Sequence, residues 1–141
     1  MPMTILVPID FEAGAARVLA FARELAGPTG AEVVVLHVYE PLPWSYPELP
    51  PNVIEDTTAA LRTAAEKSLA EFAAKNGAPK TLLREGSPWA QIVAAVEEVR
   101  PWLVVMGTHG RRGLKRLVLG SVAERVVRHS SAPVVTVHPG E

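Results

Sequence analysis

The chain has 141 residues, a formal net charge of −1 and no cysteine, and 48% of its residues are hydrophobic. That length suits one domain with a buried core, and the lack of cysteine excludes disulfides, thiolate catalysis and cysteine-bound zinc. The near-zero charge does not favour binding to nucleic acid or to an anionic membrane. We see no signal-peptide pattern in MPMTILVPID and no apolar run long enough to span a bilayer. We therefore expect a single cytoplasmic domain over residues 1–141.

The first half of the chain alternates short apolar runs with longer amphipathic stretches. Thr4–Ile9 and Glu32–Val38 are predicted strands, and the second is apolar on both faces, which is typical of a parallel sheet covered by helices on both sides. Apolar spacing between them predicts a helix over Ala13–Ala26, which Gly27 and Pro28 would end. Five of the eleven residues in Pro41–Pro51 are proline, which argues against a helix or a central strand there.

The second half repeats this alternation. Leu61, Ala65, Leu69 and Phe72 form an apolar stripe in a predicted helix over Glu55–Lys75. Ser87 and Pro88 are typical of the N-cap and first residue of a helix, whose inner face would hold Ile92, Val96 and Val99. The remaining predicted elements are strands at Lys80–Arg84, Trp102–Met106 and Pro133–Val137, and a helix at Val122–His129. The order βαβαβαβαβ predicts an α/β fold, a doubly wound parallel sheet of five strands.

The segment Gly107–Ser121 (GTHGRRGLKRLVLGS) begins where a predicted strand ends and leads into a predicted helix. Glycines permit positive φ and let backbone N–H groups approach an anion closely. A helix start adds unpaired N–H donors and the positive end of a dipole. Four cations lie in between, at Arg111, Arg112, Lys115 and Arg116. The segment therefore predicts a phosphate site at the carboxyl edge of the sheet, where Asp10 also ends a strand.

Each of these features has a structural alternative. Ser121 and Glu124 fit a capping box, and Asp10 could cap the helix that follows it. The basic cluster could be a solvated face. It lacks interleaved aromatic residues, and the net charge is −1, so nucleic-acid binding is not favoured. Glycines, helix start and cations occurring together favour the phosphate site.

The spacing G-x2-G-x9-G-S, formed by Gly107, Gly110, Gly120 and Ser121, resembles the ATP-binding signature of universal stress proteins. Further segments resemble the same family over nearly the whole chain: Val7–Phe11, Leu36–Val38, Leu103–Gly107, Gly120–Val127 and Pro133–Val137. The resemblance implies a sheet of order 3-2-1-4-5 with helices on both faces. That order would place Asp10 beside Gly107.

The resemblance also implies a site for ATP, with Mg²⁺. Asp10 would lie near the ribose or a metal-bound water, and the backbone of Val38 would face the adenine, with Pro8 and Ile9 nearby. The motif glycines and Ser121 would hold the phosphates. The expected nucleotide site also includes Met106, His109, Arg111 and Val122. The alternative for His109, which lies inside the glycine turn, is simple exposure to solvent.

Two further expectations come from the resemblance. Family members commonly form homodimers through the last strand, here Pro133–Val137, whose exposed edge could pair with its twin. A proline at Val135 would then be expected to yield monomers. The family often has Gly-Ser after the first acidic residue, whereas Phe11-Glu12-Ala13 follows Asp10 here, and this difference could alter the ribose edge. Trp102 replaces the usual Asp that opens the fourth strand.

Catalysis is not indicated, because no residue can be assigned as a general base for hydrolysis. We expect a nucleotide-gated regulatory module of the stress response with little or no turnover. The alternative is an interaction protein whose site is empty or holds AMP or a cyclic nucleotide. The chain lacks the signatures of P-loop NTPases, dinucleotide-binding Rossmann enzymes and α/β-hydrolases.

The remaining candidates are histidines and tryptophans. The four histidines show no metal-ligand spacing, His37 fits a hydrogen-bonded core position, and His129 suits the end of a helix. The tryptophans fit packing positions. Trp44 is the exception, because it lies with Tyr46 in the proline-rich segment, which could be a lid, a partner surface or a rigid connector.

Overall fold

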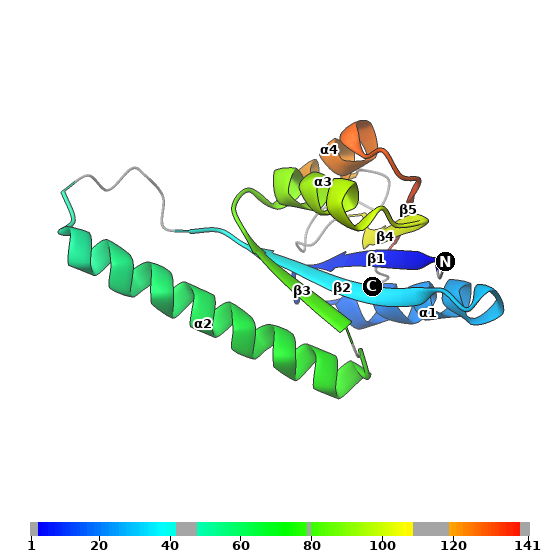
Figure 1. Ribbon diagram of the computed structural model, residues 1–141, viewed down its shortest axis with the longest axis horizontal. Helices are drawn as coiled ribbons and strands as arrows, with labels where there is room; N and C mark the ends of the chain where they lie inside the picture. The colour runs from blue at the N-terminus through cyan, green and yellow to red at the C-terminus, as the bar shows by residue number, and fades with distance from the viewer. Residues whose placement is uncertain (1–2, 42–47, 79, 109–118, 139–141) are drawn as a thin grey trace.

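Five parallel strands form a sheet of order β3-β2-β1-β4-β5, which Figure 1 shows edge-on between two layers of helices. The strands are β1 (Thr4–Ile9), β2 (Glu32–Tyr39), β3 (Lys80–Glu85), β4 (Leu103–Gly107) and β5 (Val134–Val137). The structure is a computed structural model that describes residues 3–41, 48–78, 80–108 and 119–138. The predicted fold class and strand order are confirmed.

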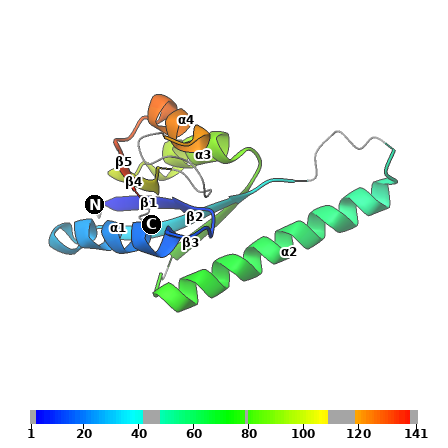
Figure 2. The same ribbon diagram turned by 180° about the vertical axis from the view of Figure 1, so that it is seen from behind.

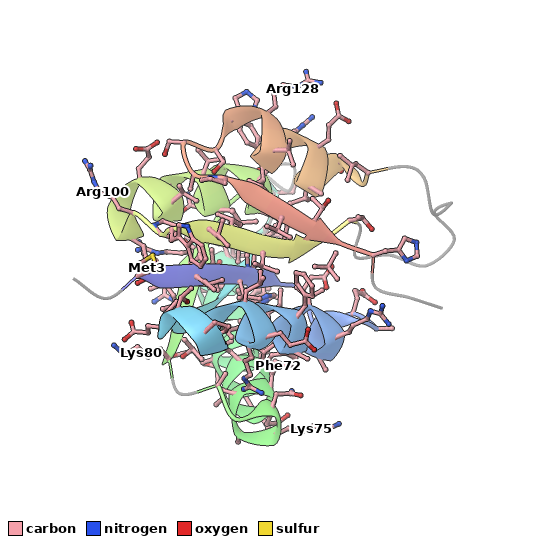
Figure 3. All side chains as sticks on the ribbon, turned by 90° about the vertical axis from the view of Figure 1, so that its right-hand side faces the viewer. Met3, Phe72, Lys75, Lys80, Arg100 and Arg128 are labelled. Carbon is pink, nitrogen blue, oxygen red and sulfur yellow. The ribbon has the colours of Figure 1, made fainter. Side chains whose placement is uncertain are left out.

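The helices pack in pairs on the two faces of the sheet. α1 (Ala15–Thr29) and α2 (Pro51–Asn76) cover one face, and α3 (Pro88–Val99) and α4 (Ser121–His129) cover the other (Figures 1 and 2). Figure 3 accordingly places Phe72 of α2 and Arg128 of α4 on opposite sides of the sheet. Both faces of the central strands are therefore removed from water, as their continuous apolar sequence predicts.

The core consists of two clusters, one on each face of the sheet. Ile5, Val7 and Ile9 of β1 contribute to the cluster under α1 and α2, whereas Leu6 contributes to the cluster under α3 and α4. This alternation follows from the two-residue period of a strand. The central position of β1 explains why Ile5, Leu6 and Val7 are all fully buried.

The prediction that Gly27 and Pro28 end the first helix is wrong, because α1 continues through them to Thr29. Pro28 lacks an N–H group, so it leaves a helix carbonyl without its usual donor. The Thr29 hydroxyl lies within hydrogen-bond distance of two carbonyl oxygens of the last turn, those of Ala26 (3.1 Å) and Leu25 (3.3 Å). Gly30 then ends the helix with a φ of 69°.

Helix α2 begins at Pro51, four residues before the predicted start at Glu55. A proline fits the first turn of a helix because its φ is already helical and its missing N–H is not needed there. Of the predicted apolar stripe, Ala65 and Leu69 are buried, but Leu61 is 37% exposed. The reason is geometric, because the N-terminal part of α2 extends beyond the sheet (Figures 1 and 2). The apolar stripe of α2 therefore extends beyond the face of the sheet on which it packs.

The other boundaries differ by at most two residues from the predicted ones, as is usual at element ends. β4 begins at Leu103 and leaves Trp102 before the strand and 38% exposed, so the predicted packing role of Trp102 is wrong. α3 has Ser87 at its N-cap and Pro88 in its first turn as expected, although the Ser87 side chain makes no capping bond. Residues 42–47, with Trp44 and Tyr46, lie outside the described residues.

Candidate functional site

A cavity of about 490 Å³ opens at the carboxyl edge of the sheet, where β1, β2 and β4 end. Its size is within the range of about 300–1,000 Å³ typical of small-molecule sites. The segments that start α1, α3 and α4 also line it. Because β1 connects onward to β2 on one side and pairs with β4 on the other, this is the switch point of the doubly wound sheet, where ligands of such folds bind.

Nine of the twelve site residues expected from the sequence line this one cavity, and they come from four separate segments of the chain. They are Pro8, Ile9 and Asp10 at the end of β1, Val38 in β2, Met106 and Gly107 at the end of β4, and Gly120, Ser121 and Val122 at the start of α4. The other three, His109, Gly110 and Arg111, lie outside the described residues.

A hydrogen bond closes the β4 side of the cavity. The N–H of Gly120 donates to the carbonyl oxygen of Thr108 at 2.7 Å, and the N–H of Thr108 donates to that of Val137 at 3.0 Å. The Gly120 N–H is thus engaged within the protein and is not the phosphate donor expected from the sequence. The helical ladder of α4 begins with the N–H of Glu124 bonded to the Gly120 carbonyl. Ser121, Val122 and Ala123 therefore have N–H groups without an acceptor in the helix.

Neither Gly107 nor Gly120 adopts positive φ, and Gly120 has φ −65° and ψ 163°. The positive-φ argument is therefore wrong for these two glycines, and the absence of a Cβ is what distinguishes them. The capping-box alternative is also wrong. The N-cap of α4 is Gly120, not Ser121, and no side chain makes a capping hydrogen bond there. The Glu124 carboxylate instead accepts a hydrogen bond from Arg128 at 2.7 Å.

The β1 side of the cavity is shaped by a turn that Asp10 closes. Its Oδ1 accepts the N–H of Glu12 at 3.0 Å. The alternative that Asp10 caps α1 is wrong, because Gly14 is the N-cap and no side chain bonds there. Both Asp10 and Glu12 are exposed and line the cavity. Two carboxylates therefore stand at the mouth of the cavity, next to the start of α1.

His37 is the half-buried polar side chain of this region. Its Nδ1 lies 2.9 Å from the carbonyl oxygen of Ile9, and since a carbonyl only accepts, Nδ1 carries the proton. Its ring packs on Phe11 with centroids 4.2 Å apart, and Phe11 in turn lies 5.9 Å from the ring of Phe72. The expected hydrogen-bonded position of His37 is confirmed, but the residue also lines the cavity, which the sequence analysis missed.

Sequence reasoning missed the other lining residues because it considered strand ends and the glycine segment alone. The start of α1 contributes Glu12, Ala13, Gly14, Ala15 and Val18, the end of β2 contributes Leu36, Tyr39 and Glu40, and α3 and α4 contribute Pro88, Ile92 and Ala123. A general signal could have found several of them. In a parallel sheet, strand ends and the starts of the helices that follow them meet at one edge.

Tyr39 connects the cavity to α2. Its hydroxyl accepts a hydrogen bond from Nε of Arg62 at 2.9 Å, and Arg62 also faces the Glu85 carboxylate at 4.0 Å. The hydrogen bond to Tyr39 raises the pKa of the Arg62 guanidinium above its ordinary value, with a smaller contribution from Glu85. This pair orients the Tyr39 side chain in the wall of the cavity.

Trp89 and His129 pack together at the interface of α3 and α4. Their ring centroids are 5.0 Å apart, and the guanidinium of Arg125 lies 5.6 Å from the centroid of the Trp89 ring. His129 is the last residue of α4, and its Nδ1 lies 2.9 Å from the Arg125 carbonyl oxygen. The predicted packing role of Trp89 and helix-end position of His129 are confirmed.

The part of the chain that the structure describes lacks two features, a membrane-spanning helix and a cluster of metal-binding side chains. No helix in those residues is long and apolar enough to cross a membrane. The described histidine, aspartate and glutamate side chains do not form a group of three or more that could hold a metal ion.

Comparison with known proteins agrees with the fold and with the resemblance seen in the sequence. A universal stress protein of Thermus aquaticus, from the QAH/OAS sulfhydrylase 3′ region, is 35% identical over 136 residues, which cover 95% of this chain and 97% of that protein. The solved structure of the universal stress protein MJ0577 from Methanocaldococcus jannaschii superposes with a TM-score of 0.80 at 25% identity and covers 100% of this chain and 99% of that one.

A third likeness concerns the fold alone. A universal stress protein solved in complex with cAMP is 24% identical, has a TM-score of 0.64 and covers 98% of both chains. The sequence model described as the universal stress protein family matches residues 1–138. Because that match spans nearly the whole chain, the protein belongs to the universal stress protein family.

Proposed function

We propose that the chain binds ATP in the carboxyl-edge cavity and acts as a nucleotide-gated regulatory module of the stress response in the cytoplasm. One observation carries the proposal. Nine residues expected at a nucleotide site, distant in sequence, line a single cavity at the switch point of the sheet. Binding would alter a regulatory state only if ATP had different affinities for two conformations or assembly states.

The helix starts around the cavity support one orientation of the ligand. The start of α1 is preceded by the carboxylates of Asp10 and Glu12, which would repel an anion. α3 begins with Pro88, which has no N–H to donate. α4 begins with Gly120 and Ser121, and its first N–H groups have no helical acceptor. The phosphates are therefore best placed at α4 and Gly107, and the nucleoside towards β1 and β2.

The lining also suits the remaining parts of ATP. Ile92 and Met106 provide apolar surface for a base, and Val38 provides backbone polar groups at the same edge. Mg²⁺ would be held chiefly by the phosphates, with Asp10 as the neighbouring carboxylate. No titratable residue lies among the described lining residues of β4 and α4, so we expect slow turnover or none.

The test starts from freshly purified protein, which is denatured so that any released nucleotide can be identified by mass spectrometry. The stripped protein is then titrated by calorimetry with Mg-ATP, AMP and cAMP. Released adenine nucleotide, or saturable binding of Mg-ATP, is the expected result. Tighter binding of AMP or cAMP would replace ATP as the ligand. If no nucleotide is released and no binding heat is measured, the alternative is favoured, in which the chain is an interaction protein that does not use the site for ATP.

We also propose that two copies pair through the open edge of β5. The N–H of Val104 donates to the Pro133 carbonyl and that of Thr108 to the Val137 carbonyl. Backbone polar groups of successive residues point to opposite edges of a strand. Those of alternate residues therefore face β4 (Pro133, Val135 and Val137), and those of the residues between them face outward (Val134 and Thr136). The test suggested by the sequence, a proline at Val135, is therefore unsuitable, because it would disrupt the β4–β5 ladder.

Thr136→Pro is the appropriate test of the dimer. It removes an outward N–H, so we expect sedimentation velocity to show monomers where the parent protein sediments as a dimer. Thermal unfolding should change little, because the ladder to β4 is kept. Val135→Pro is the matched comparison and should lower the melting temperature. Dimers that persist in Thr136→Pro would show that another surface mediates association.

A further inference from the structure

Three carboxylates and a histidine are the polar side chains that, with Tyr39, line the β1 and β2 side of the cavity. The Tyr39 hydroxyl accepts a hydrogen bond from Arg62 and keeps a proton to donate. Asp10, Glu12 and Glu40 line its mouth, and all three are exposed. Ionised carboxylates only accept hydrogen bonds. His37 places its Nδ1 at 2.9 Å from the Ile9 carbonyl oxygen, and in the neutral form of the ring the other nitrogen is an acceptor. The three carboxylates therefore make this side of the cavity rich in acceptors.

Two backbone donors of the same corner are already used. The N–H of Glu12 is bonded to the Asp10 carboxylate, and the N–H of Ala15 is bonded to the Glu12 carbonyl oxygen at 3.1 Å. None of the described lining residues is lysine or arginine. An anion placed here would meet like charge from the three carboxylates.

The opposite side of the cavity has the reverse character. The first turn of α4 offers backbone N–H groups and the Ser121 hydroxyl. Its Glu124 carboxylate is paired with Arg128. The cavity thus has a donor side at α4 and an acceptor side at β1 and β2, which would orient a ligand carrying phosphate at one end and hydroxyl groups at the other.

We propose that the acceptor side makes the site selective for adenine nucleotides that carry phosphate only at the 5′ position and have free 2′- and 3′-hydroxyls. The inference rests on the proposed ATP site and specifies its ligand class. Free ribose hydroxyls can donate to the carboxylates of Glu12 and Glu40, and hydrogen bonds to charged groups are the stronger ones. A phosphate on the 3′ oxygen removes a donor and brings a negative charge to the same carboxylates.

Glu12 and Glu40 are the specificity-determining residues in this inference. Each follows a separate strand, β1 or β2, and these strands are neighbours in the sheet. Glu40 directly follows β2, and Glu12 lies three residues beyond the end of β1, in the turn that Asp10 closes.

The test compares ligands that differ only at the ribose. Calorimetric titrations of the stripped protein would use ATP, AMP, 2′,3′-dideoxy-ATP and adenosine 3′,5′-bisphosphate at fixed Mg²⁺ and salt. We expect about tenfold weaker binding of dideoxy-ATP than of ATP, because the hydroxyl donors are lost. We expect adenosine 3′,5′-bisphosphate to bind at least about tenfold more weakly than AMP, because like charges repel.

Two variants locate the effect. In the double variant Glu12→Gln/Glu40→Gln, the ratio of bisphosphate to AMP affinity should rise at least about fivefold, because the repelling charges are removed. Glu24→Gln is the matched control, since Glu24 is an exposed carboxylate on α1 that does not line the cavity. It should leave the ratio unchanged. Raising the salt from 0.1 to 0.5 M should narrow the AMP–bisphosphate gap in the parent protein, because salt screens exposed charges.

The outcomes separate the selectivity from the site itself. If ATP and AMP bind but adenosine 3′,5′-bisphosphate binds equally well, or the double variant leaves the ratio unaltered, the selectivity is wrong and the proposed function stands. If none of the four ligands binds, the proposed function is wrong and the selectivity with it. A preference for free hydroxyls that disappears in the double variant and persists in Glu24→Gln supports the inference.

Discussion

Gly120→Val is expected to lower ATP affinity at least about a hundredfold while the protein stays folded. Gly120 lines the cavity just before the first N–H groups of α4. A branched side chain there would hold the phosphates away from these donors. Losing about two hydrogen bonds to a charged group, at roughly 1.5–3 kcal/mol each, accounts for a loss of that size. Calorimetric titration with Mg-ATP measures the affinity, and far-UV circular dichroism reports the fold.

The backbone of Gly120 makes this substitution informative. Its φ of −65° and ψ of 163° lie in the extended region that valine also adopts. Gly27→Ala is the control, because a Cβ at Gly27 meets no atom within 4 Å and Gly27 does not line the cavity. The control should keep its ATP affinity and stabilise α1 by about 0.5–1 kcal/mol. Unchanged affinity in a folded Gly120→Val protein would show that the site is wrongly placed.

Leu6→Ala is expected to lower the free energy of unfolding by about 2–5 kcal/mol. Leu6 is fully buried, with 0% of its surface accessible to water, and it belongs to the core cluster under α3 and α4. Truncation removes buried methyl groups and leaves a cavity between packed layers. The melting temperature should fall by about 10 °C, given roughly 2–4 °C per kcal/mol for a domain of this size. Urea unfolding with constant m-value measures the change.

Leu61→Ala makes the matching truncation on the part of α2 that extends beyond the sheet. Leu61 is 37% exposed, so less apolar area is lost and no cavity forms. We expect a change in the free energy of unfolding within about 0.5 kcal/mol of the parent protein. A loss at Leu61 as large as that at Leu6 would show that the N-terminal part of α2 is buried in solution, for example against a second copy.

Local patterns in the sequence were sufficient for the fold class. The apolar run Glu32–Val38 indicated a strand covered on both faces, and the N-cap and proline at Ser87 and Pro88 indicated the start of α3, where the structure has both. These signals depend on the conformational preferences of a few neighbouring residues, which a sequence displays directly. The order of the sheet came from the family resemblance, and the observed pairing agrees with it.

Local patterns failed where a distant contact or its absence decides the structure. The stripe that includes Leu61 has helical spacing, but only the reach of the sheet determines where that stripe is covered. Gly27 and Pro28 are helix breakers by local preference, yet α1 continues through them to Thr29, and Ala26, directly before them, is packed in the core cluster under α1 and α2. Such contacts are set by packing, which overrides weak local preferences.

The sequence by itself determined the order and type of the elements and the segments from which a phosphate site could be built. Only the tertiary structure decided which groups remain available in that site. Pairing of Thr108 with Gly120 engages a donor that the glycine motif was expected to offer to the phosphates, and the turn at Asp10 brings Glu12 to the mouth of the cavity. The reason is that hydrogen bonds between segments far apart in the chain use donors and acceptors that no local pattern can assign.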